Sequence, residues 1–279
     1  MPFISRDESL TRLRARVAER RPIIGAGAGT GISAKCAEQG GVDIIIIYNS
    51  GRYRMAGRGS LAGMLPYGDA NAVMMDMAGD VLPIVKHTPV LAGVCGTDPF
   101  RLMPVFLREV KAKGFDGVQN FPTVGLFEGR FRQNLEETGM GFGLEVEMIR
   151  LAHEMDLLTC PYVFNPDEAV AMTRVGADVL VPHVGLTTKG DIGAGTALTL
   201  DEAARHVQAM RDAAVAINPD VLVLCHGGPI AEPDDVQYVL DHTEGIAGFF
   251  GASSIERLAV EPAIADQARR FTNLRRRPR

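Results

Sequence analysis

The sequence predicts a single (β/α)8 barrel, or TIM barrel, with one extra helix at its N-terminus. Eight short apolar runs alternate with amphipathic stretches at regular spacing along the 279 residues. Runs that are apolar on both faces are typical of strands in a parallel sheet covered by helices. Barrels of this kind take roughly 250 residues as one domain. An open doubly wound sheet is the alternative, but eight evenly spaced units favour closure.

The first predicted element is a helix over residues 5–20. Ser5 or Asp7 can cap it, and Leu10, Leu13 and Val17 form one apolar stripe. A helix before the first strand can close the bottom of the barrel or pack on another subunit. We therefore expect one domain over residues 1–279, made of an N-terminal helix (1–21), the barrel (22–271) and a basic tail (272–279).

Strands and helices then alternate from Pro22 onwards. The predicted strands are Ile23–Ala28, Asp43–Tyr48, Val90–Cys95, Gly117–Phe121, Leu157–Phe164, Ala177–His183, Val221–His226 and Ile246–Phe250. The predicted helices between and after them are Gly31–Glu38, Ala70–Val81, Phe100–Lys113, Gly143–Glu154, Pro166–Val175, Leu200–Ile217, Pro233–Asp241 and Ile255–Phe271. Several strands are opened by a glycine that ends the previous helix, as in Gly41-Val42-Asp43.

The connection after the second strand is much longer than the ~2–6 residues usual in α/β units. Residues 50–68 are rich in Gly, Arg, Ser and Tyr, and a helix starts only near Asp69. We interpret this segment as a loop that closes over a binding site. Asn49 and Ser50 anchor it where the strand ends, and its Arg52 and Arg54 can pair with an acidic ligand.

Composition limits the classes of function. The formal net charge of −5 argues against a general nucleic-acid-binding surface, and the Arg-rich end from Arg269 is typical of a solvated tail. No apolar run approaches the ~18 residues of a membrane span, and the first ten residues do not resemble a signal peptide. The four Cys lack CxxC spacing, which favours free thiols. We expect a soluble, cytoplasmic protein.

Polar side chains follow the apolar runs at nearly every strand end. They are Asn49, Asp98, Asn120, Asn165, His183 and His226. The opposite ends of the strands carry plain Gly-Asp or Pro turns. Because active sites of (β/α)8 barrels lie at the C-terminal ends of the strands, this asymmetry favours an enzyme over a structural barrel.

Two of these side chains are expected to converge. Alternate residues of a strand share a face, so His183 lies with Val179 and Val181, and His226 lies with Leu222 and Leu224. If both faces point into the barrel, the two imidazoles meet at its mouth, where either can move a proton.

Glycines at the last two strand ends predict an anion site. Gly227 and Gly228 follow the seventh strand, and Gly251 and Ser253 follow the eighth. These loops commonly form a barrel's phosphate site, and the last helix begins just beyond them. The run Gly25–Gly31 resembles a dinucleotide fingerprint, but the rest of the chain is not a Rossmann repeat, so we expect its glycines to let backbone approach a ligand.

Asp98 has two interpretations. It can cap the following helix, or act at the barrel mouth as a magnesium ligand or general base. No second carboxylate lies at a neighbouring strand end, although Glu136, Glu137 and Glu145, beyond the long fourth loop, could reach in. No strand ends in Lys, which argues against Schiff-base chemistry, and Lys189 in the loop 185–195 remains a mobile catalytic candidate.

Seven motifs together carry a family resemblance. They are IIGAGAGTGISAK, YNSGRYRMAGRGSLAGMLPYGDAN, GVCGTDPF, VQNFPTVGL, RQNLEETGMG, LTTKG and GASSIER. With them the chain resembles the phosphoenolpyruvate-hydrolase-like TIM-barrel proteins, over about residues 22–271. A similar barrel forms the C-terminal part of plant tobamovirus-resistance proteins.

The resemblance implies membership of the phosphoenolpyruvate mutase and isocitrate lyase superfamily. Enzymes of that superfamily bind Mg²⁺ and a pyruvate-like acid and cleave or form C–C or P–C bonds. They hold the metal with several strand-end carboxylates, of which Asp98 is the match in kind here. Barrels of this superfamily also assemble through terminal helices, so we expect a homo-oligomer.

Two functions follow as hypotheses. The first is a Mg²⁺-assisted enzyme that hydrolyses or cleaves a P–C, P–O or C–C bond in a small phosphoenolpyruvate- or phosphonopyruvate-like acid. Asp98 would hold the metal, and Asn49, Asn120 and Asn165 would orient the substrate. The alternative is a barrel that senses a metabolite without turning it over. Hydrolysis by a Ser nucleophile is disfavoured because a G-x-S-x-G motif is missing.

Overall fold

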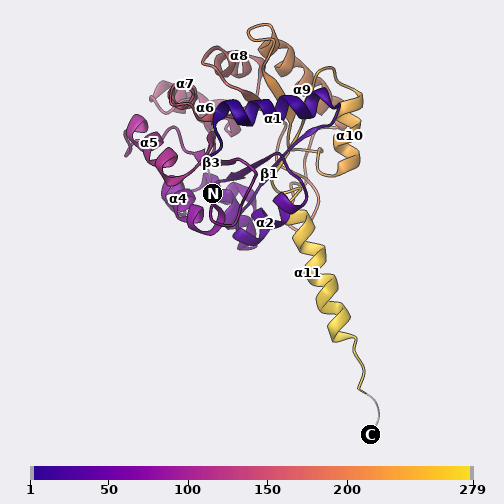
Figure 1. Cartoon of the computed structure of the whole chain (residues 1–279). Coiled ribbons are helices and arrows are strands. Elements are labelled where there is room, and N and C mark those ends of the chain that lie inside the picture. The colour runs from indigo at the N-terminus through magenta and orange to yellow at the C-terminus, as the bar shows by residue number, and fades with distance from the viewer. Residues whose placement is uncertain (1–2, 277–279) are drawn as a thin grey trace.

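Parallel strands curl into a barrel in the computed structural model, which describes residues 3–276 (Figure 1). The strands are β1 (Ile23–Gly27), β2 (Ile44–Ile47), β3 (Val90–Val94), β4 (Gly117–Asn120), β5 (Leu158–Thr159), β6 (Tyr162–Val163), β7 (Val179–Pro182), β8 (Leu222–Cys225) and β9 (Gly248–Gly251). Their order is β5-β4-β3-β2-β1-β9-β8-β7-β6. Residues 1–2 and 277–279, which include the end of the predicted basic tail, lie outside the described residues.

Strands β5 and β6 are two halves of one barrel position. β5 pairs with β4, and β6 pairs with β7, so the two ends of the sheet are joined by Cys160-Pro161. Proline has no N–H for a ladder, and the N–H of Tyr162 goes instead to the side chain of Asn120, at 2.7 Å. The nine labelled strands therefore fill eight positions, which confirms the predicted (β/α)8 class.

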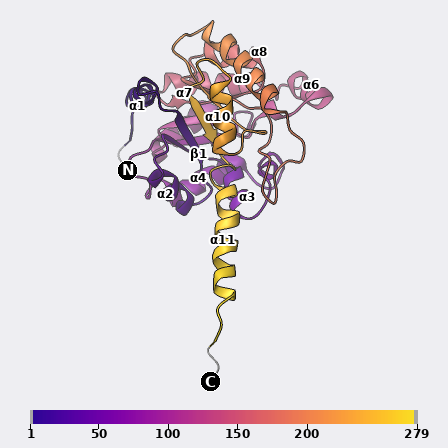
Figure 2. The ribbon, with the colours of Figure 1, turned by 90° about the vertical axis from the view of Figure 1, so that its right-hand side faces the viewer.

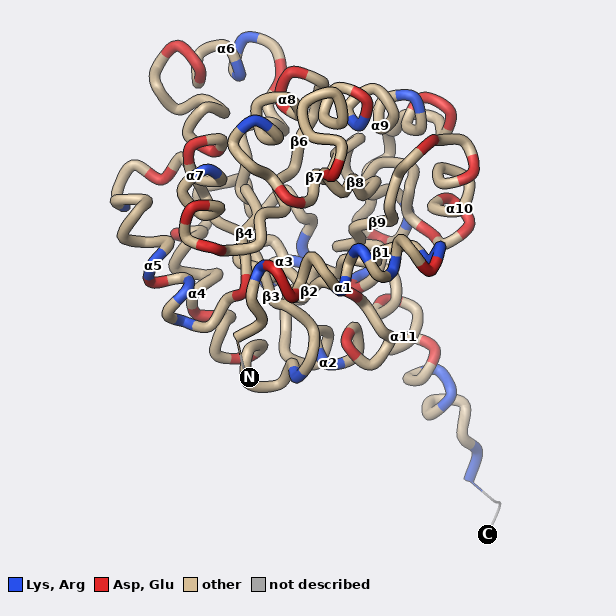
Figure 3. The backbone as a smooth tube through the Cα atoms, turned by 45° about the horizontal axis from the view of Figure 1, so that its top comes forward, with Lys and Arg blue, Asp and Glu red and all other residues tan. Residues whose placement is uncertain are grey.

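Helices surround these strands (Figure 3). They are α1 (Arg6–Ala18), α2 (Gly31–Gln39), α3 (Asn49–Met55), α4 (Ala70–Val81), α5 (Met103–Lys113), α6 (Gly129–Glu137), α7 (Gly143–Glu154), α8 (Pro166–Arg174), α9 (Leu200–Val215), α10 (Pro233–Asp241) and α11 (Arg257–Thr272). Two 3₁₀ turns, Ser60–Met64 and Val124–Leu126, complete the described elements.

Helix α3 corrects the interpretation of residues 50–68 as an irregular loop. It begins directly after β2 and brings Gly51 against the backbone of Ala28 and Gly29. A Cβ on Gly29 would lie 2.1 Å from the Gly51 carbonyl oxygen, so this contact requires glycine. The glycines after β1 thus make room for the chain's own helix. A Gly in the first turn lowers helix propensity, which hid α3 from the sequence pattern.

Helix α1 closes the N-terminal end of the barrel. Leu10 and Leu13 are buried among inward-facing strand residues, whereas Val17 is 41% exposed, so the predicted stripe is shorter than expected. The Arg6 guanidinium forms an ion pair with Asp178 at 2.6 Å, just before β7. Helix α1 thus covers the end of the barrel opposite the C-terminal ends of its strands.

Helix α11 projects away from the barrel (Figures 1 and 2). Arg257 is its only buried residue, and Ile264 and Phe271 are 68% and 65% exposed. The last predicted helix therefore exists but does not cover the barrel wall. A largely apolar groove remains beside α10, lined among others by Ile24, Val236, Leu240 and Phe249.

No described helix combines the length and the apolar character that crossing a membrane requires.

Candidate functional site

A cavity of about 170 Å³ lies at the C-terminal mouth of the barrel. Its floor is formed by side chains at the last inward-facing position of six strands, because alternate residues point into the barrel. These residues are Tyr48, Phe121, Tyr162, His183, His226 and Ala252. The rim comes from four segments, namely the 3₁₀ turn after α3, the 3₁₀ turn that ends at Leu126, the loop 186–194 after β7, and the start of α11.

The structure brings His183 and His226 together on this floor. They form a parallel bridge between neighbouring strands, and their ring centroids are 4.7 Å apart. The Nδ1 of His226 meets the Phe250 carbonyl oxygen, which can only accept, so this Nδ1 carries a proton. The Nδ1 of His183 accepts from the Gly185 N–H at 3.2 Å, so its proton is on Nε2. The pair consequently offers one acceptor, the His226 Nε2, and one donor, the His183 Nε2–H.

Both imidazoles are neutral near pH 7. Burial lowers the pKa of His226 to about 4, and the positive charge of Arg54 acts in the same direction. Burial, followed by the neighbouring His226, holds the pKa of His183 well below its ordinary value. A neutral His226 is ready to accept a proton, and a neutral His183 can donate a hydrogen bond without bringing charge.

Tyr162 completes a cluster of rings with the two histidines. Its ring centroid lies 4.9 Å from that of His226 and 5.2 Å from that of His183. Burial, and next to it Tyr48, raises the pKa of Tyr162 well above its ordinary value. The phenol therefore keeps its proton and is a donor. Tyr48 and Tyr162 were not predicted as site residues, although the alternation Ile44, Ile46, Tyr48 is the same signal that placed the histidines.

A buried ion pair lies under the Tyr48 side of the cavity. Helix α3 carries Arg54, whose guanidinium carbon is 5.3 Å from the Tyr48 ring centroid. Its Nε donates to the Glu256 carboxylate at 3.1 Å, and both side chains are about 1% exposed. Glu256 also accepts from the Gly29 N–H at 2.5 Å. The two Nη atoms of Arg54 are buried without a hydrogen-bond partner, although one lies within ion-pair distance of Glu256.

The glycines after β8 hold the rim, and the Gly228 N–H is not a free donor. The Gly228 N–H donates to the Gly185 carbonyl at 2.7 Å, and the Gly228 carbonyl accepts from Thr188 at 3.1 Å. Both Gly227 and Gly228 have positive φ, at 85° and 56°. They fasten the loop 186–194 over the cavity. On the other side of the cavity the Ser253 and Ser60 hydroxyls are 3.1 Å apart, and Ser50 donates to the Ser60 carbonyl.

Other predicted side chains lie outside the cavity lining and are occupied by the protein. Asn49 donates to the Gly63 carbonyl, Asn165 caps α8, and Asn120 links β4 to β6. Arg52 pairs with Asp76 on the surface, and Lys189 pairs with Asp235. A Cβ on Gly251 would meet Ile255 and Phe249 at 2.7 Å, so this glycine serves packing at the end of β9.

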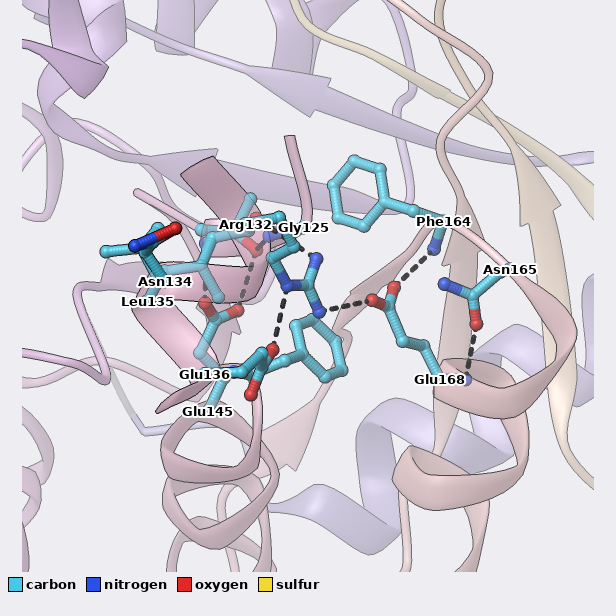
Figure 4. Close-up of polar contacts among 12 residues, drawn as sticks. Gly125, Arg132, Asn134, Leu135, Glu136, Glu145, Phe164, Asn165 and Glu168 are labelled. Carbon is cyan, nitrogen blue, oxygen red and sulfur yellow. Dashed lines mark hydrogen bonds and ion pairs between the residues drawn. The ribbon is translucent and has the colours of Figure 1, made fainter. Parts of the chain in front are cut away.

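Arg132 from α6 links the segment around Gly125 to Glu168, which contacts Phe164 (Figure 4). Arg132 donates to the Val124 carbonyl and to Glu168, which in turn accepts from the Phe164 N–H at 2.9 Å. The Phe164 ring centroid lies 5.0 Å from that of His183. A Cβ on Gly125 would overlap the Phe164 ring, at 2.1 Å, so only glycine allows this close approach.

Asp98 does not lie in a set of ligands suited to Mg²⁺. One of its oxygens accepts from the Phe100 N–H, and the other accepts from Asn71 and from Arg101. Mg²⁺ prefers oxygen ligands, and here a guanidinium occupies that oxygen instead. Across residues 3–276 there is no group of three or more His, Cys, Asp or Glu side chains that could hold a metal ion. The residues present therefore do not fit this ion.

The fold is shared with several barrels of known structure. Solved structures with the same fold include phosphoenolpyruvate phosphomutase from Streptomyces platensis, with a TM-score of 0.60, 15% identity and coverage of 94% of this chain and 87% of that one. Phosphonopyruvate hydrolase, solved with oxalate and Mg²⁺, has a TM-score of 0.57, 18% identity and coverage of 94% and 86%. The chain has the fold of the phosphoenolpyruvate mutase and isocitrate lyase superfamily.

The family model of phosphoenolpyruvate hydrolase-like proteins matches residues 8–274, and the chain belongs to that family. A curated relative, the ToMV susceptible protein tm-1(GCR26) of Solanum lycopersicum, is 62% identical over 265 residues. The match covers 95% of this chain but 35% of the relative. The chain thus spans about a third of the length of that protein.

Proposed function

We propose that this barrel is an enzyme that moves a proton on a small carbonyl-containing acid held in the mouth cavity. The observation that carries the proposal is the pairing of opposite hydrogen-bonding roles in the two neutral histidines. The His226 Nε2 accepts the proton from the carbon beside the carbonyl. The His183 Nε2–H, with the Tyr162 phenol, donates to the carbonyl oxygen as negative charge develops on it.

Related barrels support an acid of this kind. The names of phosphonopyruvate hydrolase and oxaloacetate acetylhydrolase imply substrates with a carbonyl next to a carboxylate. Removing a proton beside such a carbonyl, or returning one after a bond to that carbon breaks, is a step shared by cleavage of C–C and P–C bonds. This proposal replaces the predicted Mg²⁺-assisted reaction by proton transfer without a metal, because the groups around Asp98 do not suit Mg²⁺.

The proposal is tested by deuterium exchange. Short 2-oxo acids in D₂O are followed by proton NMR, with and without Mg²⁺. Wild type is expected to exchange the protons beside the carbonyl, and His226→Gln is expected to lose exchange by about 10²–10⁴-fold. His206→Gln, on the exposed face of α9, is the matched control and should exchange normally.

Exchange that persists in His226→Gln would contradict the assignment of the base. If calorimetry shows that the wild type binds a ligand but NMR shows no exchange, the alternative of a metabolite-sensing barrel is favoured. The hydrogen bonds of Asp98 to Asn71 and Arg101 are consistent with that alternative.

We also propose that two copies associate through α11. This helix leaves an apolar groove beside α10 open, and its own Ile264 and Phe271 are exposed. A second copy's α11 supplies an apolar face to fill that groove, and the reverse contact follows by symmetry.

Sedimentation tests this association. Wild type is expected to sediment at about twice the 30.0 kDa chain mass, and Ile264→Asp is expected to release monomers. Phe100→Asp, at a side chain 93% exposed in the β3–α5 connection, is the control and should leave the dimer intact. A monomeric wild type at micromolar concentration would overturn the proposal.

A further inference from the structure

Cationic side chains around the mouth cavity are each paired with a carboxylate. Arg54 lies 3.1 Å from Glu256, and Arg257, which lines the cavity, lies 2.9 Å from Glu261. Lys189, next to the rim loop, is 2.8 Å from Asp235. Both histidines are neutral, and no Asp or Glu is among the residues lining the cavity. The protein charge facing a ligand is therefore close to balanced.

The ion pair of Arg54 and Glu256 leaves part of the guanidinium without an acidic partner. Both Nη atoms of Arg54 are buried and make no hydrogen bond, but one of them lies 3.1 Å from the Glu256 carboxylate, so only the other lacks an acidic partner. The guanidinium faces the Tyr48 ring, and Tyr48 lines the cavity. A single negative charge on the Tyr48 side is thus favoured by the one Arg54 Nη that has no acidic partner.

The rest of the lining offers no unpaired cation to a second negative charge, because Arg257, the one Lys or Arg among the lining residues, is already paired with Glu261. Phe121, Leu126 and Leu186 line the cavity, together with Ile192 at the rim. A charged group against such side chains loses its water without gaining a partner. The volume of the cavity limits the size of the ligand. A cavity of about 150 Å³ holds a molecule about the size of benzene, and this one measures about 170 Å³.

We infer that the cavity takes a small 2-oxo acid with one negative charge and a short apolar arm, and discriminates against acids with two or more charges. The carboxylate lies on the Tyr48 side above Arg54, and the arm lies against Leu126. The carbonyl is then near His183 and Tyr162. The inference rests on the proposed function, and the acid it describes differs from the phosphoenolpyruvate- or phosphonopyruvate-like acids that the family resemblance implies.

Calorimetry with a matched pair of acids tests the charge preference. 2-Oxopentanoate and 2-oxoglutarate have the same five carbons, and the second replaces a terminal methyl by a carboxylate. Wild type is expected to bind 2-oxopentanoate at least about tenfold more tightly, with or without Mg²⁺. Tighter binding of 2-oxoglutarate, or of phosphoenolpyruvate, would overturn this inference and leave the proposed function standing. If no 2-oxo acid binds, both fail.

A gain-of-binding variant tests the position of the arm. Leu126→Arg places an unpaired cation at the apolar wall, so affinity for 2-oxoglutarate is expected to rise by about tenfold or more while that for 2-oxopentanoate falls. Leu65→Arg, at an exposed leucine outside the cavity lining, is the control and should leave the preference unchanged. Circular dichroism establishes that both variants are folded. No gain in a folded Leu126→Arg, or an equal gain in Leu65→Arg, would contradict the placement.

Discussion

Replacing Glu256 by glutamine is expected to lower the free energy of unfolding by about 3–5 kcal/mol. The carboxylate is the buried partner of Arg54 and accepts from the Gly29 N–H as well. Without its charge, a fully buried guanidinium whose Nη atoms already lack hydrogen bonds has no counter-ion. Urea denaturation of the variant and the wild type, followed by circular dichroism, measures the difference.

Two further variants show whether this loss comes from burial. Glu261→Gln removes a similar partner from Arg257, but Glu261 is 22% exposed, so we expect a loss of about 1 kcal/mol or less. The double variant Arg54→Met, Glu256→Leu removes both charges and is expected to recover much of the stability lost by Glu256→Gln. If Glu256→Gln and Glu261→Gln prove equally stable, the buried pair does not have the role assigned here.

The same pair shows where prediction from the sequence stops. Arg54 was a candidate because it follows a strand end, but its counter-ion lies 202 residues away along the chain. Only the closure of β1 against β9 brings α3 next to the start of α11. The sequence therefore indicated a cation at the mouth, and the fold pairs this cation with a buried carboxylate that the sequence could not identify.

Periodicity was most informative for groups inside the barrel. Alternation along each strand predicted that His183 and His226 share the inward face, and the structure has them adjacent. The same rule would have found Tyr48 and Tyr162, had aromatic side chains been considered with the histidines. Alternation says nothing about local hydrogen bonds, so it could not foresee that Asn165 and Asp98 are occupied by neighbouring backbone.

The eight strands were predictable because each is a continuous apolar run, whereas the placement of the last helix was not. An amphipathic pattern predicts that α11 is helical and that its apolar face packs against other apolar residues. It does not say whether that contact lies on the same chain. Helix α6 has no buried residue, which explains why a search for apolar stripes passed over it.

A second large effect is expected from Glu145, which anchors the fourth loop beside the cavity. Its carboxyl group is fully buried and accepts from Asn120, Thr123 and the Val124 N–H. Burial raises its pKa from 4.5 to about 8, although these three donors oppose the shift. The folded protein therefore holds a proton on Glu145 near pH 7, whereas the unfolded chain does not.

The sign of the pH dependence follows from this difference. Because the folded pKa is the higher one, the stabilisation from Glu145 is complete below pH 4.5 and is lost as the pH rises through about 8. A shift of this size corresponds to a loss on the order of 4–5 kcal/mol between those limits.

Glu145→Gln cannot ionise, so its free energy of unfolding is expected to depend less on pH than that of the wild type between pH 5 and 9. The variant costs some stability at pH 5, because one amide hydrogen faces the Val124 N–H or the Thr123 hydroxyl. The difference between variant and wild type across the pH range isolates Glu145 from the two histidines, which titrate below neutral pH. Glu147→Gln, at an exposed position on the same helix, is the control and should follow the wild-type curve. Parallel curves for Glu145→Gln and the wild type would show that the carboxyl group stays ionised, with its three donors outweighing burial.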